Sequence, residues 1–280
     1  MTLNLENLKK KYIKNFHNDE KLCSFVLTDV LFGFNEISEF LKEKNIKSVL
    51  EIGSGTGILL NELKNFFPNI NFLGLDPNES GYYHYREIYK SLVNPGFSIE
   101  NKQIENFSSE KKFDLIFSIN VFEHVNDWKK YIEKTNNLLT KNGLNVILCP
   151  NYDFPYEPHF VIPIIINKKI TQFIFNKKIK KHEVETNEIG MWKAINFVGK
   201  REVKKILNEK KYNYFFDLNI QKRMISRATN DKDFKNRQGL AAQFAIIAKY
   251  LYLDKLIFNL LKVPFPYMKL IIKKNNFEPL

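Results

Sequence analysis

Apolar and polar positions follow two rhythms in the first 150 residues of the chain. Short, mostly apolar segments at 48–52, 70–75 and 113–118 are typical of buried strands. The segment 58–67 between the first two, and 128–139 after the third, carry apolar residues at the spacing of three and four positions that marks an amphipathic helix. Because parallel strands need crossover connections of this length, the pattern predicts an α/β fold with a parallel sheet.

The other predicted elements extend this fold at both ends. Apolar residues at helical spacing predict one or two helices within 5–44, and these lead into the sheet. The polar stretch 226–238 is expected to be a loop. The remaining predictions are a helix at 80–92, strands near 97–100 and 144–148, a helix at 199–210, and strands near 213–220 and 241–249.

The regular alternation of strands and helices ends at Pro150. Residues 151–197 are rich in proline and aromatic residues, and we interpret them as an insertion over the carboxyl edge of the sheet. We therefore expect an N-terminal helical cap over 1–44, a main domain over 45–250 that contains the insertion, and a tail over 251–280. Because the tail mixes apolar and lysine positions, we expect it to be helical, amphipathic and basic.

Composition excludes several classes of protein. With 44% hydrophobic and 26% charged residues, the 280-residue chain can bury a core, which excludes disordered, collagen-like and disulfide-scaffold proteins. Cys23 and Cys149 provide neither a disulfide framework nor a metal-binding spacing, so no metal is expected. The N-terminus lacks the pattern of a signal peptide and no apolar run is long enough to span a membrane, so we expect a cytoplasmic protein.

The excess of positive over negative charge lies entirely in the second half of the chain. The net charge is +12, but residues 1–150 hold 18 basic and 19 acidic residues, whereas residues 151–280 hold 25 and 12. The second half therefore favours an anionic acceptor or an anionic interface. Residues 251–274 have a wide apolar face edged with lysines, so they either lie peripherally on the inner membrane surface or pack on their own domain or in a homodimer.

A glycine-rich loop follows the predicted strand at 48–52. Its motif residues are Gly53, Ser54, Gly55 and Gly57. This G-x-G-x-G spacing does not match the dinucleotide motif G-x-G-x-x-G, and no Lys-Ser or Lys-Thr follows it as in a P-loop. Glu51, directly before the loop, suits a cationic ligand better than a pyrophosphate. Asp76 ends the next strand, where a carboxylate can accept both ribose hydroxyls of an adenosine, which NAD would satisfy equally well.

Four motifs in this order and spacing resemble those of the class I S-adenosylmethionine-dependent methyltransferases. They are Val49–Gly57, Leu73–Pro77, Phe113–Ser118 with Glu123–Val125, and Leu138–Leu144. The likeness covers residues 45–150. It implies a doubly wound, mostly parallel seven-stranded sheet, the Rossmann-like methyltransferase fold. Such a sheet ends in an antiparallel hairpin, for which the strands near 213–220 and 241–249 are the candidates.

The resemblance implies S-adenosyl-L-methionine as the cofactor and also where it binds. The glycine loop would pass under the methionine part of the cofactor, with Glu51 near its charged end. Asp76 would hold the ribose. The residues expected near the adenine or the sulfonium are Pro77, Asn78, Gln103, Ser118 and Asn120.

Candidate catalytic residues follow the fourth and the fifth predicted strands. Methyl transfer is an in-line displacement, so the enzyme mainly positions the acceptor, and an oxygen acceptor also benefits from a general base. His124 with Glu123 is one candidate for this base and His159 is another, since an imidazole titrates near neutrality. The residues expected to contact the acceptor are Tyr152, Tyr156 and His159. The alternatives are that His124 packs structurally against the cofactor loop and that 151–160 is an ordered surface loop.

The resemblance therefore implies methyl transfer, and we expect O-methylation of a small-molecule, sugar or lipid-linked acceptor. One alternative is an RNA methyltransferase, but Cys149 lacks the Pro-Cys companion of RNA cytosine methyltransferases. Residues 118–121 also lack the Pro-Pro-aromatic signature of enzymes that methylate exocyclic amines of bases. A second alternative is a catalytically silent, cofactor-binding partner subunit. An oxidoreductase remains open only if NAD(H) competes for the same loop.

Overall fold

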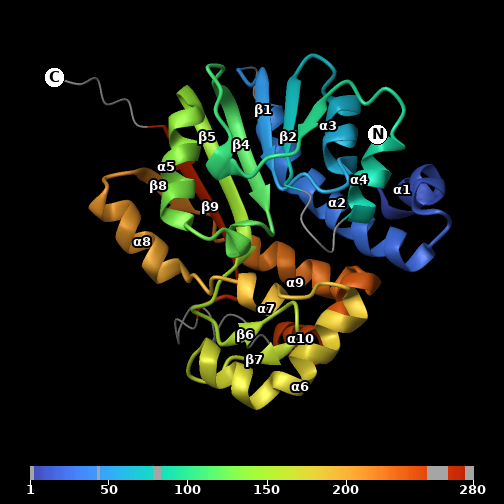
Figure 1. The fold of residues 1–280 in the computed structure, drawn as a ribbon, viewed down its shortest axis with the longest axis vertical. Helices are drawn as coiled ribbons and strands as arrows, with labels where there is room; N and C mark the ends of the chain where they lie inside the picture. The colour runs from blue at the N-terminus through green and yellow to red at the C-terminus, as the bar shows by residue number, and fades with distance from the viewer. Residues whose placement is uncertain (1–2, 43–44, 78–82, 251–263, 275–280) are drawn as a thin grey trace. The chain divides into compact units, whose positions relative to one another are not determined.

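The computed structural model describes residues 3–42, 45–77, 83–250 and 264–274. Most of its strands form a seven-stranded sheet (Figure 1). The strands of this sheet lie side by side in the order β3-β2-β1-β4-β5-β9-β8. They are β1 (Ser48–Ile52), β2 (Asn71–Leu75), β3 (Ser98–Glu100), β4 (Phe113–Ile119), β5 (Leu139–Pro150), β8 (Asn213–Phe216) and β9 (Tyr267–Lys273). A separate two-stranded sheet pairs β6 (Tyr156–Glu157) with β7 (Ile162–Pro163).

Helices connect most of these strands. Several start at a polar side chain, since Asn4, Asp19 and Asn167 each accept a hydrogen bond from an amide of the first helical turn. The α-helices are α1 (Leu5–Tyr12), α2 (Glu20–Leu41), α3 (Ile58–Phe66), α4 (Tyr83–Lys90), α5 (Trp128–Leu138), α6 (Lys168–Thr186), α7 (Met191–Ala194), α8 (Lys200–Glu209), α9 (Ile220–Asn230) and α10 (Lys232–Tyr250). Short 3-10 helices cover Ile13–Phe16, Ile104–Asn106 and Phe122–His124. The helical character predicted for 5–44 is therefore confirmed.

Parallel pairing brings the carboxyl ends of three strands together. Ile52, the last residue of β1, pairs with Leu75 of β2 on one side and with Ser118 of β4 on the other. Both pairings are parallel, as the alternation of strands and helices predicted. The strand order changes direction between β1 and β4. Open α/β sheets bind ligands beyond the carboxyl ends of the strands at such a switch point.

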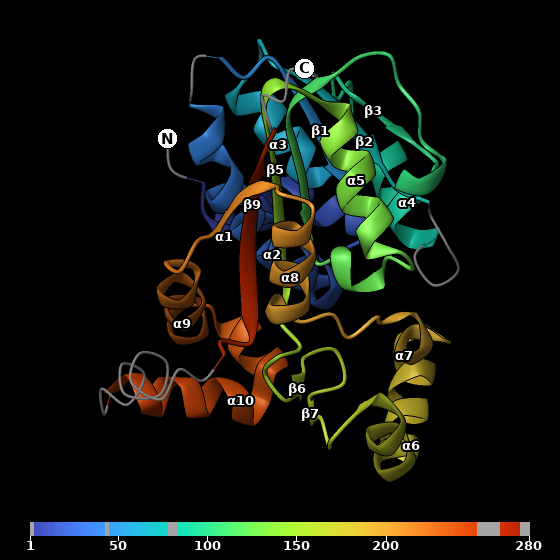
Figure 2. The ribbon, with the colours of Figure 1, turned by 90° about the vertical axis from the view of Figure 1, so that its left-hand side faces the viewer.

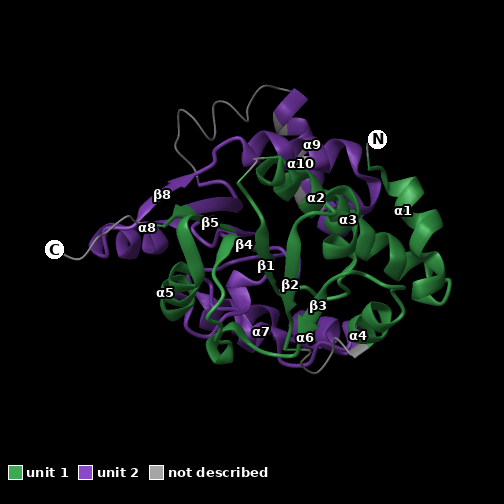
Figure 3. Cartoon of the chain, turned by 90° about the horizontal axis from the view of Figure 1, so that it is seen from above, with its two compact units in different colours: residues 1–119, 129–146, 272–280 green, residues 120–128, 147–271 purple. Residues whose placement is uncertain are grey.

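The chain divides into two compact units (Figure 3). Unit 1 comprises residues 1–119, 129–146 and 272–280, and unit 2 comprises residues 120–128 and 147–271. The core of unit 1 includes Leu50 of β1, Leu60 of α3 and Ile116 of β4, none of which has exposed surface. Burial of one such side chain contributes about 1.5–3 kcal/mol. The domain boundaries predicted at 44/45 and 250/251 do not coincide with the limits of either unit, and they stay predictions.

The insertion predicted over 151–197 has a hydrophobic core of its own within unit 2. Strands β6 and β7 lie near helices α6 and α7 in both ribbon views (Figures 1 and 2). The buried residues that join them are Phe160, Ile162, Ile179, Trp192 and Ile195. The aromatic residues of this segment therefore build a packed substructure.

Two elements predicted in the second half are wrong. Residues 241–249, predicted as a strand, belong to α10, and the predicted loop 226–238 lies mostly within α9 and α10. A short apolar run fits a buried strand and a buried helix equally well, so periodicity alone does not decide between them. The predicted strand near 213–220 is confirmed as β8, and the other antiparallel C-terminal strand of the sheet is β9 rather than 241–249.

Part of the predicted amphipathic tail is a strand of the main sheet. Of the seven residues of β9, Tyr267 to Ile272 are buried and only Lys273 is exposed. Of the two alternatives given for 251–274, packing on its own domain therefore holds for these residues, while 251–263 lies outside the described residues. Among the helices that the structure describes, none has both the length and the apolar character needed to cross a bilayer.

Candidate functional site

The glycine loop in unit 1 turns sharply at the end of β1. The amides of Gly53 and Ser54 both donate to the carbonyl oxygen of Leu75, at 2.7 and 3.1 Å, which ties the loop to the end of β2. Gly57 begins α3 with a φ of +69°. A Cβ there would lie 2.9 Å from the Tyr89 ring, so only glycine fits both the backbone conformation and the space.

Two carboxylates flank this loop. The amide of Gly55 donates to Oδ2 of Asp76 at 2.7 Å, so the carboxylate predicted to hold a ribose is anchored beside the loop. Glu51 is only 4% exposed, and its Oε2 has no hydrogen-bond partner among the described residues. Burial raises the pKa of the Glu51 carboxyl well above its ordinary value, and the nearby charge of Asp76 raises this pKa further. A buried carboxyl with one unpartnered oxygen is suited to a cationic ligand.

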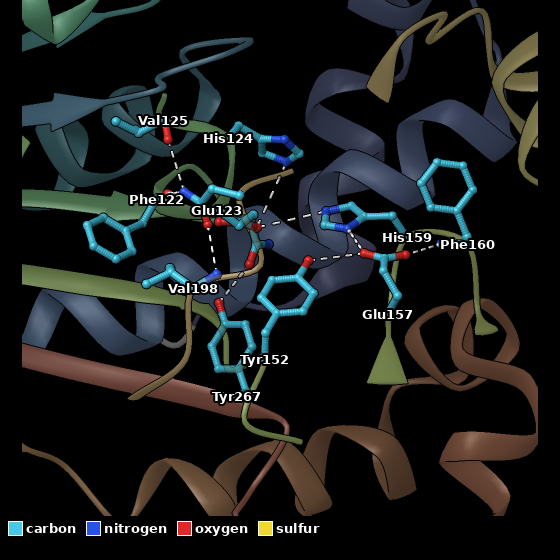
Figure 4. A network of polar contacts seen from close by, with 12 residues as sticks. Phe122, Glu123, His124, Val125, Tyr152, Glu157, His159, Phe160, Val198 and Tyr267 are labelled. Carbon is cyan, nitrogen blue, oxygen red and sulfur yellow. Dashed lines mark hydrogen bonds and ion pairs between the residues drawn. The ribbon is translucent and has the colours of Figure 1, made fainter. Parts of the chain in front are cut away.

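A second group of ionisable side chains lies in unit 2 and is drawn in Figure 4. Nδ1 of His159 lies 2.6 Å from Oε1 of Glu157. On the other edge of the same ring, Nε2 of His159 lies 3.8 Å from Oε1 of Glu123, and Nε2 of His124 lies 4.0 Å from that oxygen. The rings of His124 and His159 meet edge to face with centroids 5.1 Å apart. The structure thus brings together all three predicted catalytic residues.

Burial and charge determine the ionisation of this group. Burial lowers the pKa of His124 to about 3, and the neighbouring His159 contributes to this shift. Burial raises the pKa of Glu123 to about 7. For His159, burial lowers the pKa, but the negative charges of Glu157 and Glu123 outweigh it, so the pKa rises overall. Burial opposes ionisation of Glu157, yet the charge and hydrogen bond of His159 hold its pKa below the ordinary value. His124 is therefore a neutral imidazole near pH 7.

Comparison with known proteins decides the family. A family model described as "Methyltransferase domain" matches residues 27–212, which span both the glycine loop and the ionisable group. The chain is a class I S-adenosylmethionine-dependent methyltransferase.

Relatives of this methyltransferase include proteins with and without a named activity. It is 29% identical over 205 residues to an uncharacterised protein of Mycobacterium tuberculosis, which covers 72% of this chain and 68% of the relative. It is 28% identical over 208 residues to malonyl-[acyl-carrier protein] O-methyltransferase 2 of Ilyobacter polytropus, covering 72% and 69% of the two chains.

A solved structure supports the fold. The plantazolicin methyltransferase BpumL, in complex with a triazolic desmethylPZN analog and SAH, shares 17% identity with a TM-score of 0.52, covering 99% of this chain and all of the other. The predicted doubly wound, mostly parallel seven-stranded sheet is thereby confirmed.

The remaining residues predicted to bind the cofactor differ in their burial, in their hydrogen bonds and in the unit to which they belong. Ser118 is fully buried and its hydroxyl accepts a hydrogen bond from Tyr131 at 2.8 Å, so this side chain belongs to the core of unit 1. Asn120 lies in unit 2, where its side-chain oxygen accepts a hydrogen bond from the hydroxyl of Tyr267 at 2.8 Å. Pro77 is partly exposed after β2, Gln103 precedes a 3-10 helix, and Asn78 lies outside the described residues.

Two of the three predicted acceptor residues of the methyltransferase, Tyr152 and His159, contact Glu157. The hydroxyl of Tyr152 donates to Oε1 of Glu157 at 3.1 Å, and the amide of Phe160 donates to Oε2 at 2.7 Å. Tyr156 points to a different partner, because its hydroxyl donates to Oε1 of Gln238 at 3.3 Å. Burial raises the pKa of Tyr156 to about 12. Glu157 stood in the segment singled out by sequence, but its pairing with His159 appears only in the structure.

Asn196 is a residue of the site that sequence reasoning missed. Its side-chain amide donates to the carbonyl oxygens of Phe122 and Val125, at 2.8 and 3.0 Å, and its backbone amide donates to that of Glu123 at 2.7 Å. It therefore holds the turn that carries Glu123 and His124. No sequence signal links the two segments, because Asn196 lies far along the chain at the end of the insertion.

Cys149 and two lysines of the second half, Lys168 and Lys178, have structural environments in the methyltransferase. Cys149 is fully buried, and burial raises the pKa of its thiol well above the ordinary value, which disfavours a nucleophilic thiolate. Lys168 donates to the carbonyl oxygens of Lys193 and Ile195, at 3.0 and 2.5 Å. Lys178 donates to the carbonyl oxygen of Val161 at 2.8 Å. Part of the positive charge in this half therefore stabilises the insertion.

Proposed function

We propose that this methyltransferase methylates an oxygen atom of a small-molecule, sugar or lipid-linked acceptor. The observation that carries the proposal is the group formed in unit 2 by the buried Glu123 and the partly exposed His124 and His159. An oxygen acceptor must lose its proton during transfer, and carboxylate and imidazole groups promote that loss. The similarity to a malonyl-[acyl-carrier protein] O-methyltransferase supports an oxygen acceptor that is linked to a carrier.

Glu51 and the glycine loop fit the methyl donor. S-Adenosylmethionine supplies a methyl group on a positively charged sulfur and also carries an ammonium group. The unpartnered Oε2 of Glu51 would accept a hydrogen bond from this cationic end. Asp76, held by the amide of Gly55, would accept the ribose hydroxyls. Gly53, Ser54 and Gly57 would leave room for the close approach of the donor to the backbone.

Side chains of unit 2 would contact the acceptor. Glu123 and the two histidines would contact the acceptor oxygen and promote loss of its proton. Tyr152 and Glu157 would keep His159 in its orientation, since both lie in one hydrogen-bonded chain with it. The lysines that remain exposed in this half favour an anionic acceptor.

Cofactor binding tests the donor half of the proposal. Asp76→Ala and Gly55→Arg are each expected to abolish S-adenosylmethionine binding in isothermal titration calorimetry, because one removes the ribose acceptor and the other fills the loop at a φ of +49°. Lys273→Ala, at an exposed strand end, serves as the control and should bind normally. Unchanged affinity in both loop variants would refute the site.

A methyl-transfer screen tests the acceptor half. Radiolabelled S-adenosylmethionine is incubated with the full chain and with lipid, glycan, acyl-carrier-protein and RNA fractions, and the methylated atom is then identified by mass spectrometry. We expect label on an oxygen of a lipid, glycan or carrier-linked product. Label in RNA, or binding without turnover on every fraction, would instead favour the RNA methyltransferase or the silent partner subunit.

A further inference from the structure

Glu123 is a buried carboxylate whose two oxygens accept no hydrogen bond from the described residues, although Oε1 lies within ion-pair distance of two histidines. Its side chain has no exposed surface, and neither Oε1 nor Oε2 has a hydrogen-bond partner among the described residues. An ionisable group in this state is unfavourable unless a cation or a proton meets it. The other buried carboxylate of the group, Glu157, is satisfied by the amide of Phe160 and the hydroxyl of Tyr152. Of these two buried carboxylates, only Glu123 therefore lacks hydrogen bonds from the described residues.

Two imidazoles complete a set of ligand atoms around this carboxylate. Within the part of the chain that the structure describes, Glu123, His124 and His159 each place one donor atom within 4.8 Å of the others. A first-row divalent cation sits about 2.0–2.2 Å from such atoms, which brings ligands to roughly 3.0–3.5 Å from one another. The observed separations from Glu123 are 3.8 and 4.0 Å. Small side-chain movements would therefore bring the three ligand atoms to the separations found around a bound ion.

His159 is already oriented as a metal ligand. Its Nδ1 lies 2.6 Å from the carboxylate of Glu157, so the proton of the neutral ring is held on that side. The lone pair of Nε2 then faces Glu123. A carboxylate that fixes the tautomer of a ligating histidine in this way is a recurring feature of protein metal sites.

We propose that Glu123, His124 and His159 form a binding site for a divalent first-row transition-metal ion. Two imidazole nitrogens and one carboxylate favour zinc, manganese, iron(II) or cobalt over magnesium and calcium, which prefer oxygen ligands. The ion would leave open positions for an acceptor oxygen, and a bound cation makes loss of the proton from that oxygen easier. This last role rests on the proposed function, whereas metal binding itself does not.

A proton is the competing occupant of the space beside Glu123. A protonated His159 could form an ion pair with Glu123, but the 3.8 Å between Nε2 and Oε1 is too long for a hydrogen bond. A proton between the two groups would therefore leave the carboxylate oxygens unsatisfied. Direct metal titration distinguishes the two occupants.

Cobalt(II) is the probe for the test, because its visible absorption reports nitrogen and oxygen coordination without any need for methyl transfer. The full chain is stripped with a chelator and titrated with Co²⁺, and Zn²⁺ and Mn²⁺ are measured by calorimetry. We expect one ion per chain. Glu157→Gln should weaken binding by about 10–100-fold through the misoriented histidine. Glu123→Gln and His159→Ala should weaken it more, and His84→Gln, an exposed histidine of α4, should not change it.

Circular dichroism shows whether each variant is folded. If Glu123→Gln does not fold, His124→Ala, at a side chain that is 28% exposed, replaces it as the ligand variant. Absence of stoichiometric Co²⁺, Zn²⁺ and Mn²⁺ binding in the folded wild-type chain would overturn the proposal. Binding that survives in both His124→Ala and His159→Ala would do the same. Metal binding without methyl transfer to any acceptor would instead count against the proposed function alone.

Discussion

Replacement of Glu51 by glutamine tests how the methyltransferase holds its positively charged donor. Glu51→Gln keeps the shape of the side chain but removes the negative charge from a carboxyl that is buried and has an unpartnered oxygen. A hydrogen bond to a charged group contributes about 1.5–3 kcal/mol. We therefore expect the dissociation constant for S-adenosylmethionine to rise by about 10- to 150-fold.

The raised pKa of Glu51 adds a second signature. An acid whose pKa is raised by folding contributes stability that is present below its ordinary pKa, about 4.3, and is lost as the pH rises above it. Near pH 8, Glu51→Gln should therefore have a Tm equal to or above that of the wild-type chain. Binding of the cationic donor ionises the carboxyl, so the wild-type chain should release a proton that the variant does not.

Calorimetry in phosphate and in Tris measures both the affinity and the proton release, because the two buffers differ in ionisation enthalpy. Glu62→Gln is a matched control in the same unit, since Glu62 is also buried but already bonds Lys11 at 2.6 Å. This control should lose stability and keep its donor affinity. If Glu51→Gln binds the donor as tightly as the wild type and still releases the proton, Glu51 does not contact the cationic end.

Substitutions at four further positions test other parts of the structure. Gly57→Ala should lower both Tm and donor affinity in calorimetry, because its Cβ would lie 2.9 Å from a tyrosine ring at a φ of +69°; an unchanged variant would contradict this account of the loop. Asn196→Ala should cost about 1–3 kcal/mol in urea unfolding, since the buried carbonyls it serves lose their donors, and it should also slow methyl transfer. Trp192→Ala should cost about 3–5 kcal/mol, whereas Trp192→Phe should cost far less because the indole nitrogen has no partner among the described residues; equal losses would show that packing does not dominate there. Asp217 bonds Arg223 at 2.7 Å, and although burial opposes ionisation, its hydrogen bonds hold its pKa below the ordinary value. Its contribution is thus present above about pH 3.9 and lost as the pH falls through the lowered pKa, so acid titration of Asp217→Asn should show a smaller loss of stability than the wild type.

The positions of the glycine loop and of Asp76 could be predicted from sequence because their determinants are local. A mostly apolar segment that ends in glycines defines β1 and its loop, and Asp76 follows β2 directly. Parallel pairing of β1 and β2 then places the carboxyl ends of these strands next to each other. For Ser118 the same logic predicted the position but not the role, because Tyr131 uses its hydroxyl within the core.

The last strand of the sheet could not be predicted in the same way. The apolar segment 241–249 was predicted as a strand, yet it lies in α10, and the strand of the sheet is the later Tyr267–Lys273. Whether an apolar segment becomes a strand depends on a neighbouring strand with unpaired backbone groups. For β9 these neighbours are β5 and β8, which lie far away in sequence.

The fold class, the glycine loop with Glu51 and Asp76, and the three candidate catalytic residues could all be proposed from local sequence. Their chemistry depends on residue type and on the distance along the chain from a strand end. The folded chain adds that Glu157 orients His159, that Asn196 holds the turn of Glu123, and that the Glu123 oxygens accept no hydrogen bond from the described residues. These facts are contacts between distant segments, and burial sets their energies, so they exist only once the chain has folded.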